Sequence, residues 1–198
     1  MRVKDLVFYT KHPKLIVDQI RFKIWLKRNP DVPWISPKAV EYLDKKLNKE
    51  MNALEWGSGR SSTWYAKRVG KLLTIEHNKI WYRVVLSQMK KDGISNVEIR
   101  HVSLDHPEDE PSKDHYDVIP KYVRVVDEYD NNSLDFVSID GHYRGACVKE
   151  VKNKIKKGGY LLIDNTDWIP IEQWGIPKEW KIVHNSTNGV TQTTIWLK

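Results

Sequence analysis

The feature that most constrains this chain is an apolar run that passes through an acid into two closely spaced glycines. Residues 52–59 read NALEWGSG. An apolar strand that ends in Gly-x-Gly is typical of a turn at which the backbone approaches a ligand, because glycine adopts positive φ at little cost. We expect a helix over 63–69, capped by Ser61 or Ser62, whose N-terminus attracts anionic groups. The pattern predicts the first strand–loop–helix unit of a nucleotide-binding α/β sheet.

A second acid follows at the distance that such a sheet requires. Residues 71–77 read KLLTIEH and predict the next strand, which ends at Glu76 and His77. A carboxylate about twenty residues after the glycines is placed to accept hydrogen bonds from a ribose diol. The two signals together indicate an adenosine-type ligand, whereas ordinary turn glycines and a solvated acid are the alternative interpretation.

The residues around the glycines disfavour a dinucleotide. Ser62 stands where a dinucleotide fingerprint has its third glycine, and Glu55 precedes the first glycine. A carboxylate there repels a pyrophosphate but suits an ammonium and a sulfonium, the charged groups of S-adenosylmethionine. A nicotinamide-dependent oxidoreductase is therefore the less favoured hypothesis.

This acid-Gly-x-Gly motif, with Glu76 as ribose acid, resembles class I S-adenosylmethionine-dependent methyltransferases, from about residue 37 to the C-terminus. The resemblance implies a three-layer Rossmann-like α/β fold, with a seven-stranded, mostly parallel sheet and one antiparallel C-terminal strand. It implies cofactor contacts from Glu55, Trp56, Gly57, Ser58, Gly59, Ser61, Ser62, Glu76, His77, Ser103 and Asp140.

The second half of the chain predicts two further strands with polar ends. Residues 134–139 lead to Asp140, and 160–163 lead to Asp164 and Asn165. Between them we expect a helix through Cys147, Val148, Val151 and Ile155, closed by 156–159. Open α/β sheets bind ligands at the carboxyl ends of their strands, so these polar groups are expected to meet in one crevice.

The strand-end polar groups also resemble those of metal-dependent O-methyltransferases. That resemblance implies that Asp140, Asp164 and Asn165 hold a divalent cation; oxygen ligands suit Mg²⁺, which could lower the pKa of an acceptor hydroxyl. Alternatively, the three residues only end strands and satisfy loop amides. The chain offers His142, Tyr143 and Arg144 where those enzymes place a lysine, and residues 139–147 look closer to a group of bacterial methyltransferase-like proteins.

His142 is our candidate general base, with Asp140 and Asp164 as further catalytic residues; a helix-capping His142 is the alternative. No Asn-Pro-Pro-Tyr-like tetrapeptide follows the fourth strand, and Cys147 lies at helical spacing with core residues, so oxygen is the favoured acceptor atom. We expect a methyltransferase acting on a hydroxyl of a small molecule or glycan. An inactive S-adenosyl-ligand-binding scaffold or sensor is the competing hypothesis.

The N-terminal part is expected to be a helical extension and linker, residues 1–36, ahead of a methyltransferase domain, residues 37–198. Residues 13–28 predict an amphipathic helix, which we expect to pack on the body of the protein. Alternatively, it covers the acceptor pocket, rests on an anionic membrane surface or pairs two subunits as a homodimer. Ser36 and Pro37 predict the N-cap and first turn of the next helix. The residues at helical spacing are Leu15, Ile16, Gln19, Ile20, Lys23 and Trp25.

Composition restricts the partners. The net charge of +7 comes from 33 Lys and Arg against 26 Asp and Glu, and the lysines fall mainly on expected helix surfaces, so nucleic acid is not favoured. One cysteine and no signal-peptide pattern predict a cytoplasmic protein, and no apolar run has membrane-spanning length.

Three further segments bear on the crevice. The polar stretch 105–117 is long enough for a lid, although a solvated loop is favoured over a metal site. Trp168 and Trp174 are expected to overlook the crevice, whereas Trp56, Trp64 and Trp196 suit the core. Residues 180–184 and 193–197, joined by an Asn-Gly turn, predict a closing antiparallel pair.

Overall fold

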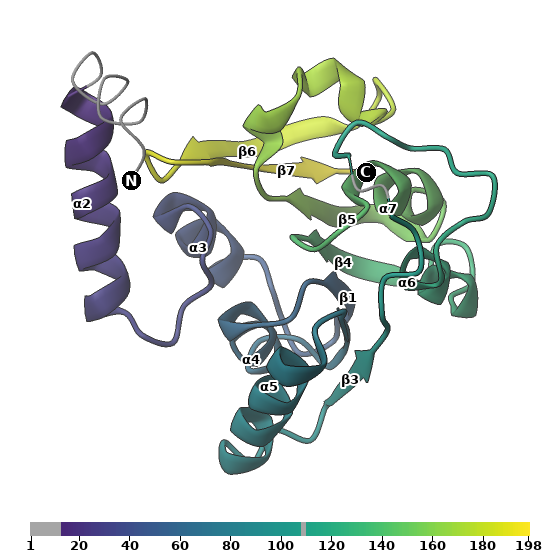
Figure 1. Ribbon diagram of the computed structural model, residues 1–198, viewed down its shortest axis with the longest axis horizontal. Helices are drawn as coiled ribbons and strands as arrows, with labels where there is room; N and C mark the ends of the chain where they lie inside the picture. Colours follow the sequence, from purple (N-terminus) through teal and green to yellow (C-terminus); the bar gives the residue numbers. More distant parts are fainter. Residues whose placement is uncertain (1–12, 108–109) are drawn as a thin grey trace.

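The computed structural model describes residues 13–107 and 110–198, and its centre is one seven-stranded sheet (Figure 1). The sheet order is β3-β2-β1-β4-β5-β7-β6, and only β7 runs antiparallel to its neighbours. The predicted fold class and the closing antiparallel strand are therefore confirmed. The strands are β1 (Asn52–Trp56), β2 (Lys71–Glu76), β3 (Val97–His101), β4 (Leu134–Ile139), β5 (Ile155–Ile163), β6 (Lys181–Thr187) and β7 (Gln192–Leu197).

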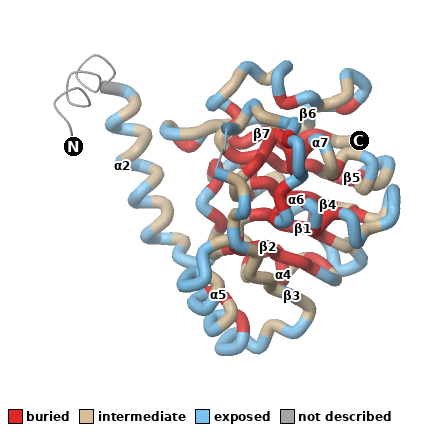
Figure 2. The backbone as a smooth tube through the Cα atoms, turned by 45° about the vertical axis from the view of Figure 1, so that its right-hand side comes forward, coloured by how far each residue is buried: buried red, intermediate tan, exposed pale blue. Residues whose placement is uncertain are grey.

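Helices cover both faces of this sheet. On one face α3 and α4 pack against the strands, and on the other α6 and α7 do so. Figure 2 shows the central strands largely in red, for buried residues, and α2 in tan and blue. Helix α5 follows β2 and contacts β2, β3 and α4. The helices are α2 (Pro13–Arg28), α3 (Pro37–Asp44), α4 (Arg60–Ala66), α5 (Lys79–Lys91), α6 (Lys121–Arg124) and α7 (Arg144–Val151), with 3-10 turns η1 (Val125–Glu128), η2 (Thr166–Trp168) and η3 (Ile171–Trp174).

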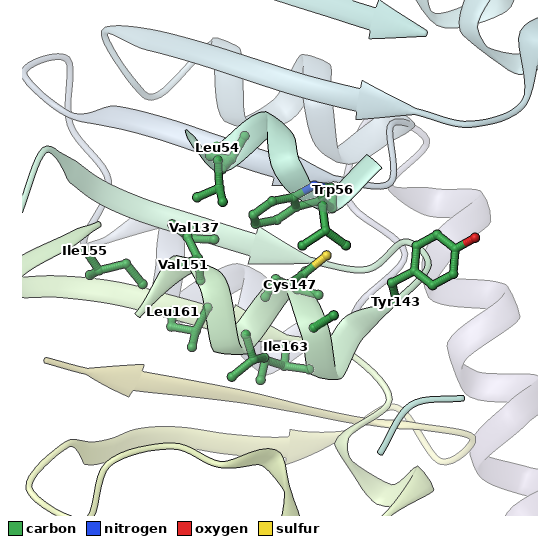
Figure 3. Packing of buried hydrophobic residues seen from close by; sticks show 14 of the residues in the cluster. Leu54, Trp56, Val137, Tyr143, Cys147, Val151, Ile155, Leu161 and Ile163 are labelled. Carbon is green, nitrogen blue, oxygen red and sulfur yellow. The ribbon is translucent and has the colours of Figure 1, made fainter. Parts of the chain in front are cut away.

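Alternate strand residues supply the two cores, as a pleated sheet requires. In β4, Val137 lies in the core under α7, and Phe136 lies in the core under α3 and α4. Cys147 and Val151 of α7 pack on the first of these cores (Figure 3). Cys147 is fully buried, so the prediction that it is a packing residue is confirmed, as is core packing of Trp56, Trp64 and Trp196.

Two element boundaries differ from the prediction. Helix α7 ends at Val151, and residues 156–159 belong to β5 rather than to a helix end. Leu134 pairs with Ile155, the register then shifts, and Gly158 has a φ of +82°. This irregularity is a β-bulge in β5, and glycine at position 158 adopts the positive φ that it contains. The bulge allows β5 to begin at Ile155, earlier than predicted. Helix α4 likewise begins at Arg60, three residues before the predicted start.

Helix α2 has the predicted bounds, but it packs through a different face. Residues at positions 15, 18, 19, 22, 25 and 26 are partly buried, whereas Ile16, Ile20 and Lys23 are exposed. The helix lies beside α3 and the β6–β7 turn (Figure 1). There, a Cβ added at Gly189 would come within 2.2 Å of Asp18, so helix and turn are in close contact. Residues 1–12 of the expected extension lie outside the described part.

Ser36 is the N-cap of α3, as predicted, and Pro37 occupies its first turn. The Ser36 hydroxyl does not cap the helix, however, because it hydrogen-bonds the Ser186 hydroxyl at 2.7 Å and so joins α3 to β6. No helix in the described residues combines the length and the apolar character needed to cross a membrane.

Candidate functional site

A cavity of about 640 Å³ opens at the carboxyl ends of β1, β2 and β4. Strand order changes direction between β1 and β4, which is where open α/β sheets bind ligands. Predicted site residues that line it are Gly57, Ser58, Glu76, His77, Asp140 and His142. The other lining residues are Asn78, Trp81, Pro111, Gly141, Arg144 and Trp168.

The glycine loop is held tightly between its neighbours. Gly57 has a φ of +96°, and a Cβ there would lie 2.7 Å from the Gly141 nitrogen. Its N–H donates to the Ile75 carbonyl at 3.0 Å, and the Trp81 indole donates to the Ser58 carbonyl at 2.8 Å. Only glycine fits at position 57. Gly59, in contrast, has an extended backbone with φ of 174°, which other residues can adopt.

Glu76 forms the polar wall of the cavity. Its side chain is 3% exposed. The carboxylate accepts a 2.8 Å hydrogen bond from the Ser58 hydroxyl and a 2.7 Å hydrogen bond from the Asn78 backbone N–H. The His77 Nδ1 atom lies 3.1 Å from the same carboxylate. A carboxylate has about four acceptor positions, so lone pairs remain for a diol, and the arrangement fits a bound ribose.

Glu55, Trp56 and Ser62 lie behind the glycine loop and do not line the main cavity. The Glu55 carboxylate accepts hydrogen bonds from Ser62 at 2.5 Å and from Thr74 at 2.7 Å. Burial raises the pKa of Glu55 to about 7, and the neighbouring hydroxyls oppose this rise. The Ser62 hydroxyl also accepts from the Gly59 N–H at 3.0 Å. The Trp56 indole donates into the core, to the Tyr122 carbonyl.

The remaining predicted cofactor residues are distributed differently. The rings of His77 and His142 stand edge to face, with centroids 4.2 Å apart, so both histidines belong to the same side of the cavity. Ser61 lines an adjoining cavity of about 290 Å³ together with Trp34 and Arg60. Ser103 is exposed in the segment after β3 and does not line the main cavity.

The strand ends of β4 and β5 meet around one buried arginine. The Arg144 guanidinium donates to the Asp140 carboxylate at 3.1 Å and to the Asn165 side-chain oxygen at 2.8 Å. The Asp164 carboxylate accepts instead from the Thr193 hydroxyl at 2.5 Å. Burial raises the pKa of Asp140, against the opposing charge of Arg144. Burial, with the charge of Asp140, raises the pKa of Asp164 to about 7.

Asp140, Asp164 and Asn165 are brought together as predicted, but the arrangement does not fit the predicted cation. The Asp140 and Asn165 side-chain oxygens accept hydrogen bonds from Arg144, and the Asp164 carboxylate accepts one from Thr193. The described residues contain no group of three or more His, Cys, Asp and Glu side chains suited to a metal ion. We therefore derive no step of the chemistry through Mg²⁺.

A separate cavity of about 400 Å³ lies between α2 and these strand ends. Phe22 and Leu26 of α2 form apolar walls with Trp34 and Val190, and Asp140, Asp164 and Asn165 supply polar groups. Lys23 is the one lysine among the residues that line this cavity. Asp140 lines this cavity as well as the main one, so the two adjoin at its side chain.

Among the described residues of the segment 105–117, Pro111 is the one that lines the main cavity. The Tyr143 hydroxyl donates to the His106 carbonyl at 2.7 Å, which anchors the segment to the β4–α7 turn. Residues 108–109 lie outside the described part. Trp168 lines the cavity as predicted, whereas Trp174 is 2% exposed and belongs to the core.

Asn78, Trp81 and Arg144 line the main cavity, although the sequence pattern predicts no role for them there. Asn78 stands two residues after Glu76 and caps α5, and asparagine is a recognisable N-cap signal. Trp81 lies one turn later in that helix and donates to the Ser58 carbonyl of the glycine loop. The position of Arg144 has no local signal, because its partners at 164 and 165 come from the end of β5.

Solved structures share this fold at low sequence identity. A methyltransferase from Geobacter sulfurreducens is 10% identical, with a TM-score of 0.60, over 91% of this chain and 87% of that one. A SAM-dependent methyltransferase from Aquifex aeolicus is 16% identical, with a TM-score of 0.54, over 86% and 95%. A Streptococcus mutans protein in complex with SAH is 11% identical, with a TM-score of 0.57, over 80% and 94%.

These likenesses show that the chain shares the Rossmann-like fold of these structures. No protein-family model matches the chain, and no curated protein matches it.

Proposed function

We propose that this protein transfers a methyl group from S-adenosylmethionine to a hydroxyl oxygen of a small molecule or glycan. The observation that carries the proposal is Glu76, whose buried carboxylate faces the main cavity between Ser58 and Asn78. Neighbours that share the fold include SAM-dependent enzymes, which agrees with an S-adenosyl ligand in this cavity.

The charges of the cavity favour that ligand over a dinucleotide. Glu76 and Asp140 place two carboxylates on its lining, and a pyrophosphate would be repelled by both. Arg144 is the arginine of this lining, but its donors are directed to protein oxygens. A ligand that carries an ammonium and a sulfonium is attracted by the same carboxylates. S-adenosylmethionine supplies an activated methyl group at that sulfonium.

The cavity beside α2 is our proposed acceptor site. Its walls from Phe22, Leu26 and Trp34 would pack on the body of an acceptor, and its polar groups would orient a hydroxyl. Positioning that hydroxyl next to the sulfonium supplies much of the acceleration of such a transfer. A volume of about 400 Å³ suits a small molecule or a single sugar unit.

Asp164 is better placed than His142 to accept the hydroxyl proton. Asp164 lines the acceptor cavity, whereas His142 lines the main cavity beside His77. A general base must lie within hydrogen-bond reach of the proton that it removes. We therefore assign His142 to the cofactor side and the proton-accepting role to Asp164, with Asp140 between the two cavities.

Calorimetric titration of S-adenosylmethionine, S-adenosylhomocysteine and NAD tests the cofactor part of the proposal. We expect both S-adenosyl ligands to bind and NAD to give no heat. Screening hydroxylated compounds with S-adenosylmethionine, by mass spectrometry for a gain of one methylene unit, then tests the reaction. Binding without methylation of any hydroxylated acceptor would favour the scaffold hypothesis, and binding of NAD alone would overturn the proposal.

A further inference from the structure

Arg144 makes an unusually complete set of hydrogen bonds at the ends of β4 and β5. Nε donates to the Gly141 carbonyl at 2.9 Å, and Nη2 donates to the Asp140 carbonyl at 2.9 Å and to its carboxylate at 3.1 Å. Nη1 donates to the Asp164 carbonyl and, at 2.8 Å, to the Asn165 side-chain oxygen. A guanidinium has five N–H donors, so each donor has a protein acceptor.

These acceptors include the oxygens that a hard divalent cation would need. Mg²⁺ and Ca²⁺ bind carboxylate, carbonyl and amide oxygens, which are the groups that surround Arg144. The side chain of Arg144 is 7% exposed, and the Trp168 ring covers the guanidinium at 4.5 Å. Arg144 already binds the Asp140 Oδ1 atom, the Asn165 side-chain oxygen and backbone carbonyls, so an ion at these oxygens would compete with a buried, fully bonded arginine.

The local backbone directs Arg144 into this position at a conformational cost. Tyr143, immediately before it, has a left-handed backbone with φ of 52° and ψ of 40°, and Asn165 has φ of 58° and ψ of 38°. Tyr143 adopts this region at a cost of about 1–2 kcal/mol, whereas asparagine adopts it more readily. Tyr143 immediately precedes Arg144, and the Asn165 side-chain oxygen accepts a hydrogen bond from the guanidinium. The fold therefore maintains strain at the turn that leads into Arg144.

We infer that Arg144 is a positioning residue that takes the place of a divalent cation, and that this protein binds its ligands and works without one. The guanidinium joins the β4 and β5 ends as a bridging ion would, and it cannot be lost to a chelator. It carries one positive charge rather than two. Beside the Asp140 carboxylate, which lines the main cavity, a smaller positive charge leaves the site more attractive to a cationic methyl donor.

The inference that turnover needs no divalent cation rests on the proposed function. The Mn²⁺ titration that follows does not depend on it. Metal-free protein is titrated with Mn²⁺ and followed by electron paramagnetic resonance, in the unaltered chain and in Asp140→Asn. We expect the unaltered chain and Asp140→Asn to show the same Mn²⁺ binding, because position 140 holds no ion in either protein. One tightly bound Mn²⁺ per chain that disappears in Asp140→Asn would overturn the inference, whether or not S-adenosyl ligands bind.

Hydrogen exchange of Arg144→Met tests the positioning role. We expect amides in 140–144 and 164–168 to exchange at least about tenfold faster than in the unaltered protein, because five hydrogen bonds are lost. Arg124→Met is the matched control, since Arg124 is exposed and pairs with Asp127. Unchanged exchange in Arg144→Met would contradict the role; if that variant does not fold, the Mn²⁺ measurement decides alone.

A chelator provides the comparison with the proposed reaction. S-adenosylhomocysteine affinity and, once an acceptor is found, turnover should be equal with Mg²⁺ and with EDTA. Turnover that is lost with EDTA and restored by Mg²⁺ would overturn the inference while supporting methyl transfer. Absence of any S-adenosyl-ligand binding would instead contradict the proposed function and leave the Mn²⁺ result standing.

Discussion

The two sides of the site hold their acids in opposite ways. On the side of β2, Glu76 accepts hydrogen bonds from a hydroxyl and a backbone amide, and it keeps acceptor capacity toward the cavity. On the side of β4 and β5, Asp140 is paired with a fixed guanidinium. The first arrangement suits an acid that binds a ligand, and the second suits an acid whose main partner is the protein itself.

The largest expected effect is on S-adenosylmethionine affinity, when one carboxylate on each side of the site is replaced by an amide. Glu76→Gln should weaken S-adenosylmethionine binding by about 10- to 100-fold, because hydrogen bonds to a charged acceptor contribute about 1.5–3 kcal/mol. Asp164→Asn, on the other side, should leave that affinity nearly unchanged and lower turnover. Isothermal calorimetry measures both affinities. Equal losses in the two variants would contradict the division between a cofactor side and an acceptor side.

A smaller effect concerns Glu55, which lies beneath the cofactor side. Burial raises the pKa of Glu55 from 4.5 to about 7, so the folded protein binds this proton more tightly than the unfolded chain. Its contribution to stability is fully present below the unfolded pKa and is lost as pH rises through 7. The free energy of unfolding, relative to Glu55→Gln, should fall by about 2 kcal/mol from pH 5 to pH 8.

Urea denaturation at the two pH values measures this difference. Glu172→Gln, which removes an exposed acid, is the control and should show no such change. A difference between the unaltered protein and Glu55→Gln that stays constant with pH would show that Glu55 titrates normally.

The smallest expected effect concerns the link between α5 and the glycine loop. Trp81→Phe removes the 2.8 Å hydrogen bond to the Ser58 carbonyl but keeps an aromatic ring. One neutral hydrogen bond contributes about 1 kcal/mol, so S-adenosylmethionine affinity should fall by about fivefold. The same variant should not alter the exchange of amides 164–168 on the acceptor side. A change there would show that the two sides are mechanically coupled.

The sequence predicted the residues that line the main cavity better than the cluster at the ends of β4 and β5, for a physical reason. Gly57, Glu76 and their loop follow each other along the chain, and the strand period and turn chemistry place them. Arg144 depends on Asp164 and Asn165, which β5 brings beside it only once the sheet forms. The early start of β5 likewise depends on pairing with β4, which competes successfully with the helical pattern.

The close contact of Gly189 with Asp18 has a consequence for evolution of the acceptor site. The hydrogen atom at position 189 sets how near α2 approaches the β6–β7 turn, since a Cβ there would lie 2.2 Å from Asp18. Phe22 and Leu26 lie further along the same helix and line the cavity that we propose as the acceptor site. A side chain at position 189 would therefore push α2 away from the turn and shift these two walls of the cavity. Substrate range could change through one residue of a hairpin turn, without alteration of any group that takes part in the chemistry.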